Sequence, residues 1–281
     1  MELLDGRKLS DKIKSELKAE IETLKSKHDV VPGLAVILVG DDPASRAYVR
    51  MKEKACDEVG VYSIVHKMPN TISHDEILKI IEMMNGNPYI DGILVQLPLP
   101  SQVDKDSLLE AIDKEKDVDG FHPYNMGRLV MGLDSFVPCT PLGVMELLAE
   151  HKVDVKGMNA VVVGASDIVG KPMASLLLNA GATVDICHIL TKDLKSHTLN
   201  ADIILVGVGK PDLITADMVK EGAVIVDIGI NKVGDKLVGD VSYDSVAPKT
   251  SHITPVPGGV GPMTIAMLMK NTVTAAKARR C

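Results

Sequence analysis

Short apolar runs alternate with segments of helical periodicity from one end of this chain to the other. Two clear runs are GLAVILVG at 33–40 and NAVVVGAS at 159–166, and each is followed by a segment with the spacing of an amphipathic helix. Strands and helices that alternate in this way form parallel sheets with helices packed on their faces. The sequence therefore predicts the α/β class throughout.

The same pattern places the individual elements. We expect helices near residues 8–28, 44–60, 74–85 and 141–151, one from 170, and a last one with Pro262 in its first turn. We expect strands at 33–40, 61–67, 90–100, 159–166, 182–187, 201–209, 223–230 and 252–257. The last helix has an apolar face, so we expect it to pack back on the first half of the chain.

The chain has 281 residues, which is enough for two domains at roughly 100–200 residues each. The segment 117–141 is rich in Gly and Pro and has no sustained period, so we interpret it as a hinge. We expect a first domain at 1–139, completed by the helix at 262–281, and a second at 140–261. Two domains imply a cleft between them.

The composition excludes several classes of partner. The net charge of −7 and the absence of a basic run argue against nucleic acid, because phosphate backbones are bound by clustered Lys and Arg. No window approaches the ~18 consecutive apolar residues of a membrane helix, and the charged N-terminal segment resembles no signal peptide, so we expect a cytoplasmic protein. The four cysteines lack paired spacing, and we expect no metal and no disulfide.

A glycine turn between strand 159–166 and the following helix has the order that presents backbone N–H groups to a dinucleotide phosphate. Gly164 and Gly170 mark this turn, but their spacing is not G-x-G-x-x-G, so an ordinary strand–helix turn stays open as the alternative. The next strand ends in Cys187 without the carboxylate typical of NAD sites, and Asp185 lies inside that strand. Nearby Lys171 and Lys192 favour NADP over NAD.

The helix expected at 44–60 carries a lysine, Lys52, beside its apolar stripe and four residues after Tyr48, so these two side chains are neighbours. The residues of that stripe are Ala44, Ala47, Tyr48, Met51, Ala55 and Val59. A lysine beside buried apolar surface has a lowered pKa, which suits proton transfer near neutral pH. The alternative is that Lys52 only buries its stem and exposes its ammonium group.

Two further polar residues stand where parallel sheets build their sites. Gln96 lies at the carboxyl end of an apolar strand, and Asp119 begins the hinge. Either residue alone is equally compatible with a solvated loop, since Gln and Asp are common at turns. Their convergence with Lys52 would indicate a catalytic site.

Taken together, six segments closely resemble the bifunctional methylenetetrahydrofolate dehydrogenase/methenyltetrahydrofolate cyclohydrolase family, and the resemblance covers essentially the whole chain. The segments are the Tyr48–Lys52 helix, VQLPLP at 95–100, KDVDGFHP at 116–123, GASDIVGKP at 164–172, VDIGIN at 226–231 and TPVPGGVGPMT at 254–264. The resemblance implies a folate-binding catalytic domain and a Rossmann-like NADP domain. It also implies a homodimer that oxidises 5,10-methylenetetrahydrofolate to the 5,10-methenyl form and hydrolyses that product to 10-formyltetrahydrofolate.

The resemblance also implies roles for individual residues. Lys52 is the central acid/base residue, Gln96 orients and tunes it, Asp119 binds the pterin ring, and Tyr48 packs on the aminobenzoyl part of folate. Further folate contacts are expected from Pro257, Gly258, Gly259 and Thr264. The cofactor is expected to contact Gly164, Ala165, Ser166, Ile168, Gly170, Lys171, Ile189 and Ile230.

This chain departs from the family pattern at the adenosine end of the cofactor. It has Asp167 where the family usually has Asn, Lys171 where it has Arg, and Ile189 where a hydroxylated residue is common. Two alternatives to the folate enzyme stay open. One is another two-domain NADP dehydrogenase, such as one that reduces a shikimate-like ketone. The other is a dinucleotide-sensing module without catalysis.

Overall fold

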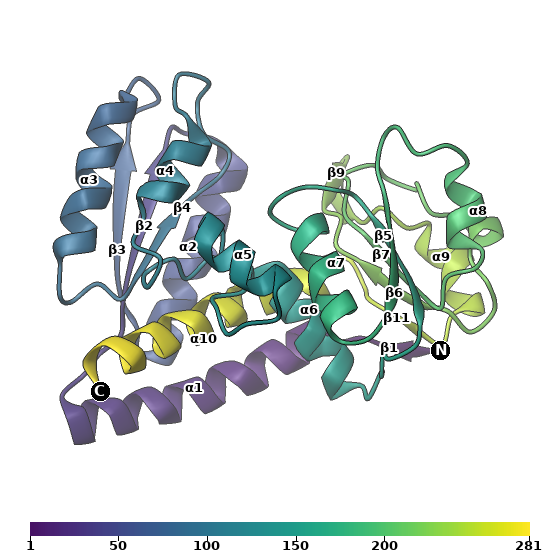
Figure 1. Cartoon of the computed structure of the whole chain (residues 1–281), viewed down its shortest axis with the longest axis horizontal. Coiled ribbons are helices and arrows are strands. Elements are labelled where there is room, and N and C mark those ends of the chain that lie inside the picture. Colours follow the sequence, from purple (N-terminus) through teal and green to yellow (C-terminus); the bar gives the residue numbers. More distant parts are fainter. The chain divides into compact units, whose positions relative to one another are not determined.

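A computed structural model describes all residues from 1 to 281, and the chain divides into two compact units, whose elements are labelled in Figure 1. The three-stranded unit comprises residues 11–128, 135–139 and 265–281. The six-stranded unit comprises residues 1–10, 129–134 and 140–264. Each unit contains a parallel sheet and helices, as the α/β pattern predicts.

The three-stranded unit is built on a parallel sheet in the order β3-β2-β4. Its strands are β2 (Gly33–Val39), β3 (Tyr62–Met68) and β4 (Gly92–Val95), and its helices are α1 (Gly6–His28, from residue 11 on), α2 (Pro43–Val59), α3 (His74–Gly86) and α4 (Lys105–Ala111). Ala35, Ile37 and Val39 pack in one core with apolar side chains of α3 and α4. The intervening β2 residues are buried too, so both faces of this strand are covered, as is usual for parallel sheets.

The six-stranded unit contains a parallel sheet in the order β1-β11-β8-β7-β5-β6. Its strands are β1 (Glu2–Leu3), β5 (Asn159–Val163), β6 (Thr183–Cys187), β7 (Ile203–Val206), β8 (Val224–Asp227) and β11 (His252–Ile253). Helices α6 (Cys139–Glu150), α7 (Gly170–Asn179), α8 (Leu194–Thr198) and α9 (Tyr243–Val246) and the hairpin β9 (Asn231–Val233) and β10 (Lys236–Val238) complete it.

In each parallel sheet, one strand pairs on its two sides with the next two strands of that sheet along the chain. In the six-stranded sheet β5 pairs with β6 on one side and with β7 on the other. In the three-stranded sheet β2 pairs with β3 on one side and with β4 on the other. The loops diverge at such a reversal, so ligands of open α/β sheets bind there, outside the carboxyl ends of the strands.

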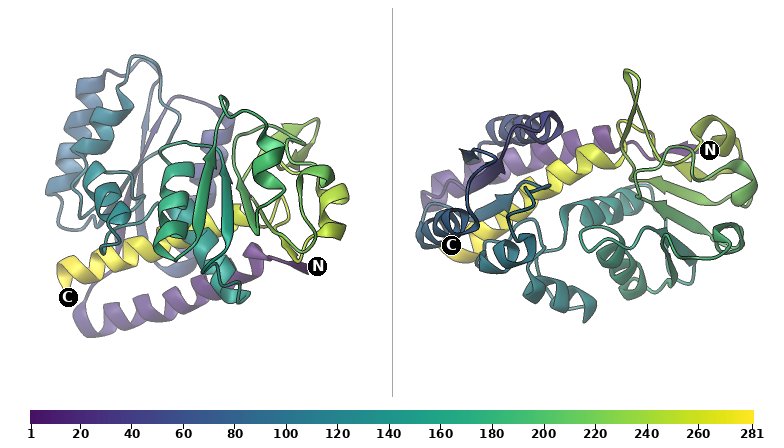
Figure 2. Two further views of the ribbon diagram at one scale, coloured as in Figure 1. Left: turned by 45° about the vertical axis from the view of Figure 1, so that its right-hand side comes forward. Right: turned by 90° about the horizontal axis from the view of Figure 1, so that it is seen from above.

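The last helix, α10 (Val260–Arg280), joins the three-stranded unit from residue 265 on. It runs beside α1 (Figure 2), and Lys277 pairs with Glu20 of that helix at 2.6 Å. The fully buried Asp91 accepts hydrogen bonds from Arg279 at 3.1 Å and from Arg280 at 2.5 Å. The expected return of this helix to the first half of the chain is therefore confirmed.

Several elements differ from the sequence expectations. The strand expected at 90–100 ends at Val95, because Pro98 and Pro100 have no N–H to continue the ladder. The expected hinge contains a helix, α5 (Pro123–Val130), whose first residue has the fixed φ that suits a helix start. The short edge strand β1 and the hairpin of β9 and β10 have too few residues to show a period.

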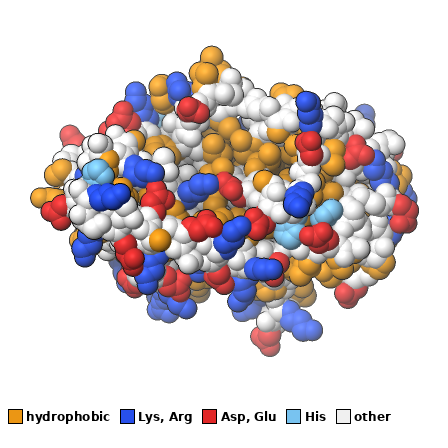
Figure 3. Space-filling model, turned by 90° about the horizontal axis from the view of Figure 1, so that it is seen from below, with side chains coloured by type: hydrophobic (Ala, Val, Ile, Leu, Met, Phe, Trp, Pro, Cys, Tyr) orange, Lys and Arg blue, Asp and Glu red, His pale blue; other side chains and the backbone are white.

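Charged side chains of both signs are interspersed on the face drawn in Figure 3. This distribution agrees with the modest negative net charge of the chain. None of the helices combines the length and the apolar composition that crossing a membrane requires.

Candidate active site

Helix α2 places its lysine differently from the sequence expectation. Its start is fixed by Asp42, whose carboxylate accepts the N–H of Ser45 at 2.7 Å. The buried side chains of this helix are Ser45, Val49, Lys52, Ala55, Cys56 and Val59. The predicted stripe is therefore wrong at Ala44, Ala47 and Met51, which are exposed. Alanine and methionine are also found at solvent-exposed positions, so the positions of these residues alone did not show which face of α2 is buried.

Lys52 lies on the buried face of α2 and not at its edge, with only 6% of its surface exposed. Its Nζ donates a hydrogen bond of 3.0 Å to Oε1 of Gln96, which follows the carboxyl end of β4. The same Nζ lies 5.5 Å from the ring centroid of the half-buried Tyr48. The expected neighbourhood of these three residues is thus present. The alternative of an ammonium group extending into solvent is wrong.

The electrostatics of this cluster depend on burial and on one carboxylate. Burial lowers the pKa of Lys52 below its ordinary value, and the charge of Asp119 opposes that effect. Burial likewise raises the pKa of Asp119, and the charge of Lys52 opposes that shift. The net result is a Lys52 pKa below, and an Asp119 pKa above, the value of each group in water. A lysine tuned in this way is suited to accept and return a proton.

A second buried carboxylate shapes the loop that carries Asp119. Asp117 accepts the backbone N–H groups of Phe121 at 3.1 Å and His122 at 2.8 Å, and the side-chain amide of Asn125 at 2.8 Å. Burial raises the pKa of Asp117 to about 6. Its carboxylate joins the loop to the first turns of α5, so we interpret Asp117 as the residue that holds the loop in shape.

Two residues that hold the loop of Asp119 were not predicted from the sequence. The buried thiol of Cys139 donates to the carbonyl oxygen of Val118 at 3.4 Å and interacts with the Asp119 carboxylate. Asn271 of α10 donates from Nδ2 to the same carbonyl oxygen at 2.9 Å. The only sequence signal was a polar Asn271 within an otherwise apolar helix face, and nothing local connected it to residue 139.

The glycine turn after β5 has the geometry of a phosphate-binding turn. Gly164 has a φ of +121°, and a Cβ on Gly170 would lie 2.0 Å from the carbonyl oxygen of Gly164, so both positions require glycine. Ser166 Oγ accepts the N–H groups of Val169 at 3.2 Å and Gly170 at 3.3 Å, which fixes the entry into α7. Ala165 and Ile168 are half-buried in the same turn. The turn lies at the β5/β7 reversal, where a dinucleotide is expected to bind.

Of the two lysines expected near the cofactor, one is already part of an ion pair in the structure. Lys171 forms an ion pair with Asp167 at 2.5 Å, so its charge is already partnered. Asp185 lies within β6, as expected, and pairs with His197 at 3.2 Å. Lys192 is exposed in the turn that follows β6.

The other predicted residues form two groups in the six-stranded unit. Ile189 and Ile230, at the carboxyl ends of β6 and β8, are 97% and 51% exposed, and so present apolar surface to a ligand. The segment that precedes α10 includes Pro257, Gly258 and Gly259, and Thr264 in the helix shares a hydrogen bond of 2.9 Å with Thr140. The structure does not bring these residues into the unit that holds Lys52.

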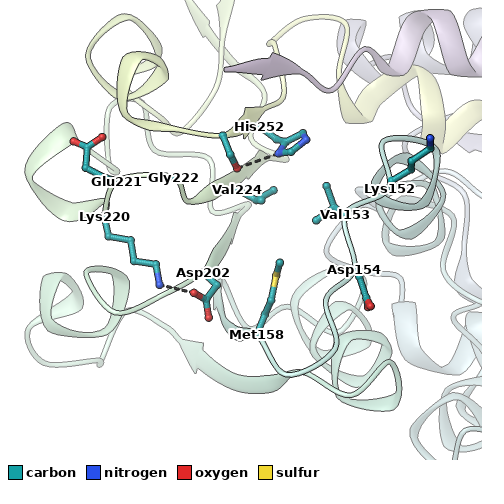
Figure 4. A pocket seen from close by; sticks show the side chains of 11 residues that line it. Lys152, Val153, Asp154, Met158, Asp202, Lys220, Glu221, Gly222, Val224 and His252 are labelled. Carbon is teal, nitrogen blue, oxygen red and sulfur yellow. Dashed lines mark hydrogen bonds and ion pairs between the residues drawn. The ribbon is translucent and has the colours of Figure 1, made fainter.

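One hollow lies elsewhere in the six-stranded unit. It has a volume of about 450 Å³ and lies at the amino ends of the strands (Figure 4), where Lys220 pairs with Asp202 and His252 bonds to Ser251. Its charged residues have both signs, and none was predicted for the site. No group of three or more His, Cys, Asp or Glu side chains is placed to hold a metal ion.

Comparison with known proteins identifies the family. Residues 4–119 match the tetrahydrofolate dehydrogenase/cyclohydrolase catalytic domain, and residues 138–280 match the NAD(P)-binding domain of the same family. The chain belongs to the tetrahydrofolate dehydrogenase/cyclohydrolase family. It is 70% identical over 280 residues to the bifunctional protein FolD of a Nitratiruptor species, covering 100% of this chain and 99% of the relative.

Two solved structures of the family are similar over nearly the whole chain. The bifunctional enzyme of Campylobacter jejuni has a TM-score of 0.98 at 56% identity and covers 99% of each chain. The enzyme of Trypanosoma brucei, complexed with NADP cofactor and inhibitor, has a TM-score of 0.95 at 37% identity and covers 98% of this chain and 97% of that one. The family, the two-domain α/β class and the dehydrogenase/cyclohydrolase function predicted from the sequence are confirmed, and the two alternatives lose their support.

The charge of Asp119 should affect the pH dependence of methenyltetrahydrofolate hydrolysis by this enzyme. In Asp119→Asn the charge that opposes the lowering of the Lys52 pKa is gone, so the Lys52 pKa falls further. We expect the limb of the pH–rate profile for methenyltetrahydrofolate hydrolysis that reports Lys52 to move to lower pH. Rates from pH 6 to 9, corrected for the uncatalysed reaction, measure the limb, and a shift to higher pH would contradict the assignment.

Proposed function

We propose that this enzyme oxidises 5,10-methylenetetrahydrofolate with NADP and hydrolyses the 5,10-methenyl product to 10-formyltetrahydrofolate at one site centred on Lys52. The observation that carries the proposal is the buried Lys52 ammonium group, held by Gln96 and flanked by Tyr48 and Asp119. We assign folate binding to the three-stranded unit and dinucleotide binding to the six-stranded unit. The positions of the two matched family domains support this assignment.

The oxidation step requires no strong acid or base from the protein. The two folate nitrogens that flank the methylene carbon assist hydride loss, because the product is a delocalised amidinium cation. The bound cofactor supplies the hydride acceptor. The contribution of this chain is to hold the carbon in position, which is catalysis by proximity. Tyr48 and Asp119 are proposed to do this by packing on the aminobenzoyl ring and by accepting pterin N–H groups.

Hydrolysis of the methenyl cation requires proton transfer at two stages. Water must add to the carbon and lose a proton, and one folate nitrogen must then leave in protonated form. Lys52 in its neutral amine form, which its lowered pKa makes accessible, is proposed to accept the first proton and return it to the leaving nitrogen. The hydrogen bond to Gln96 orients Nζ for both transfers. Pro257, Gly258, Gly259 and Thr264 are proposed as further folate contacts.

The residues of the six-stranded unit fit a dinucleotide. Gly164 and Gly170 let the backbone of the turn pack closely at the start of α7, where a pyrophosphate is stabilised by backbone N–H groups. Ala165, Ser166, Ile168, Ile189 and Ile230 would line the nucleotide. NADP is favoured over NAD because the turn after β6 offers the exposed cation Lys192 and no strand-end carboxylate. Lys171 contributes less, since Asp167 partners its charge.

We expect NADP to support oxidation with a kcat/KM at least about tenfold above that of NAD, because one charge-assisted hydrogen bond to the 2′-phosphate supplies that factor. The measurement is an absorbance assay with methylenetetrahydrofolate and each cofactor that follows methenyl formation and decay. Lys192→Ala should lower the ratio of kcat/KM with NADP to kcat/KM with NAD. Lys195→Ala should leave this ratio unchanged, because Lys195 is an exposed lysine that already pairs with Asp217. A higher kcat/KM with NAD would contradict the preference.

Two further properties concern the assembly and the location of the enzyme. We propose that the enzyme is a homodimer and acts in the cytoplasm. Sedimentation of the purified chain and fractionation of the cells that contain it would test these proposals.

A further inference from the structure

The fully buried Asp240 follows the hairpin of β9 and β10, and it binds a loop at the carboxyl end of β7. Its Oδ2 accepts the N–H groups of Val208 at 2.7 Å and Gly209 at 3.0 Å, and its Oδ1 accepts the N–H of Lys210 at 2.8 Å. The side chain of Asn231 donates to Oδ1 at 2.8 Å. Three successive N–H groups thus enclose one carboxylate, an arrangement that commonly binds anions.

A second carboxylate holds Asp240 itself in place. Asp227, at the end of β8, accepts the N–H groups of Asp240 at 3.0 Å, Val241 at 2.9 Å and Gly229 at 3.0 Å. A Cβ on Gly229 would lie 2.3 Å from the Asp240 carboxylate, so the loop after β8 passes directly against it. The two aspartates therefore join the loops after β7 and β8 to the base of the hairpin.

The loop that Asp240 binds lies against the dinucleotide turn. A Cβ on Gly164 would meet the carbonyl oxygen of Gly207 at 2.8 Å and Cγ1 of Val208 at 3.2 Å. Val208 is 43% exposed, so it presents an apolar side chain beside the turn. Ile230, the residue before Asn231, is likewise an exposed apolar side chain, on the loop after β8. Both side chains are thus attached to backbone that Asp240 fixes.

We propose that Asp240 is a positioning residue for the dinucleotide: it fills the anion-binding loop 208–210 from inside the protein and so fixes Val208 and Ile230 at the wall of the cofactor site. This inference rests on the proposed NADP-dependent activity. A carboxylate suits the position because it is acceptor-only and has about four lone-pair sites, which match its four hydrogen-bond donors. Without it, three backbone N–H groups would need new partners and the loop would move.

The bifunctional activity separates a positioning role from a role in folding. Oxidation needs the dinucleotide, whereas hydrolysis of pre-formed methenyltetrahydrofolate is proposed to need only the Lys52 site. Asp240→Asn keeps the side-chain volume but replaces one acceptor oxygen by an NH₂ group that faces N–H donors. We expect the KM for NADP to rise roughly ten- to hundredfold, because displacement of a site wall by about 1 Å has an effect of that size. The KM for methylenetetrahydrofolate and the hydrolysis rate should stay within about twofold.

The experiment compares the wild type with Asp240→Asn, Asn231→Ala and the control Asp235→Asn. Asn231→Ala removes one of the four donors and should give a smaller rise in the KM for NADP. Asp235 is an exposed aspartate of the same hairpin, so its variant makes the same change of charge without touching the loop. Calorimetric titration with NADP and the melting temperature are measured for each protein.

Weaker NADP binding with retained hydrolysis in Asp240→Asn supports the proposal. Equal losses of oxidation, hydrolysis and melting temperature would assign Asp240 to folding alone and overturn it, as would unchanged NADP binding. Absence of NADP binding by the wild type would instead overturn the proposed function, and the inference with it.

Discussion

Lys52→Met is expected to lower the rate of methenyltetrahydrofolate hydrolysis by at least about 100-fold, the usual effect of losing a positioned general acid/base. Methionine keeps much of the apolar stem that lies on the buried face of α2 but removes the ammonium group that donates to Gln96. The fold should survive, because the change removes a buried charge and leaves no charged partner within hydrogen-bonding distance. Oxidation should fall less, since the folate nitrogens assist hydride loss.

The test measures hydrolysis directly from pre-formed methenyltetrahydrofolate, after the melting transition and NADP binding of the variant have been checked. Lys54→Met is the matched control, because Lys54 lies on the same helix with 78% of its side chain exposed and pairs with Glu58. Its hydrolysis rate should equal that of the wild type. Near-normal hydrolysis by Lys52→Met would remove Lys52 from the mechanism.

Asp91→Ala is expected to give the largest loss of stability, about 3 kcal/mol, the lower end of the range for breaking a buried ion pair. Asp91 is fully buried and accepts from Arg279, Arg280 and the backbone N–H of Gly33, so its removal takes the carboxylate partner from all three. The Gly33 N–H loses its acceptor, whereas each arginine keeps a hydrogen bond to a backbone carbonyl oxygen. The loss lies at the lower end because the two arginines keep about a fifth of their side chains exposed and can be partly hydrated. The last turn of α10 should detach first.

Urea unfolding followed by circular dichroism measures the change, and hydrogen exchange of residues 265–281 locates it. Asp57→Ala is the control, because Asp57 is an exposed aspartate on α2 of the same unit. Asp91→Asn, which keeps the volume and one acceptor, should lose less stability than Asp91→Ala. An Asp91→Ala protein as stable as the wild type would show that the arginine pair does not hold the helix.

Much of the candidate site could be predicted from local sequence. The neighbourhood of Tyr48 and Lys52 follows from their spacing of four on a helix, and Gln96 follows from its place after an apolar strand. The glycine turn at 164 and 170 was predictable for a similar reason, because a strand, a turn with glycines and a helix are successive in the chain. The orientation of α2 was not, since its exposed alanines and Met51 are as apolar as its buried residues.

The sequence by itself determined the α/β class and the family and supplied the candidate residues for the chemistry, because these depend on short-range periodicity and on motifs. Only the tertiary structure decided that Lys52 faces the interior, that Cys139 and Asn271 lie beneath Asp119, and that Asp240 binds the loop after β7. These contacts join residues that are far apart in the chain. Local spacing carries no information about such pairs, because their proximity depends on how the sheets order their strands and where the last helix packs.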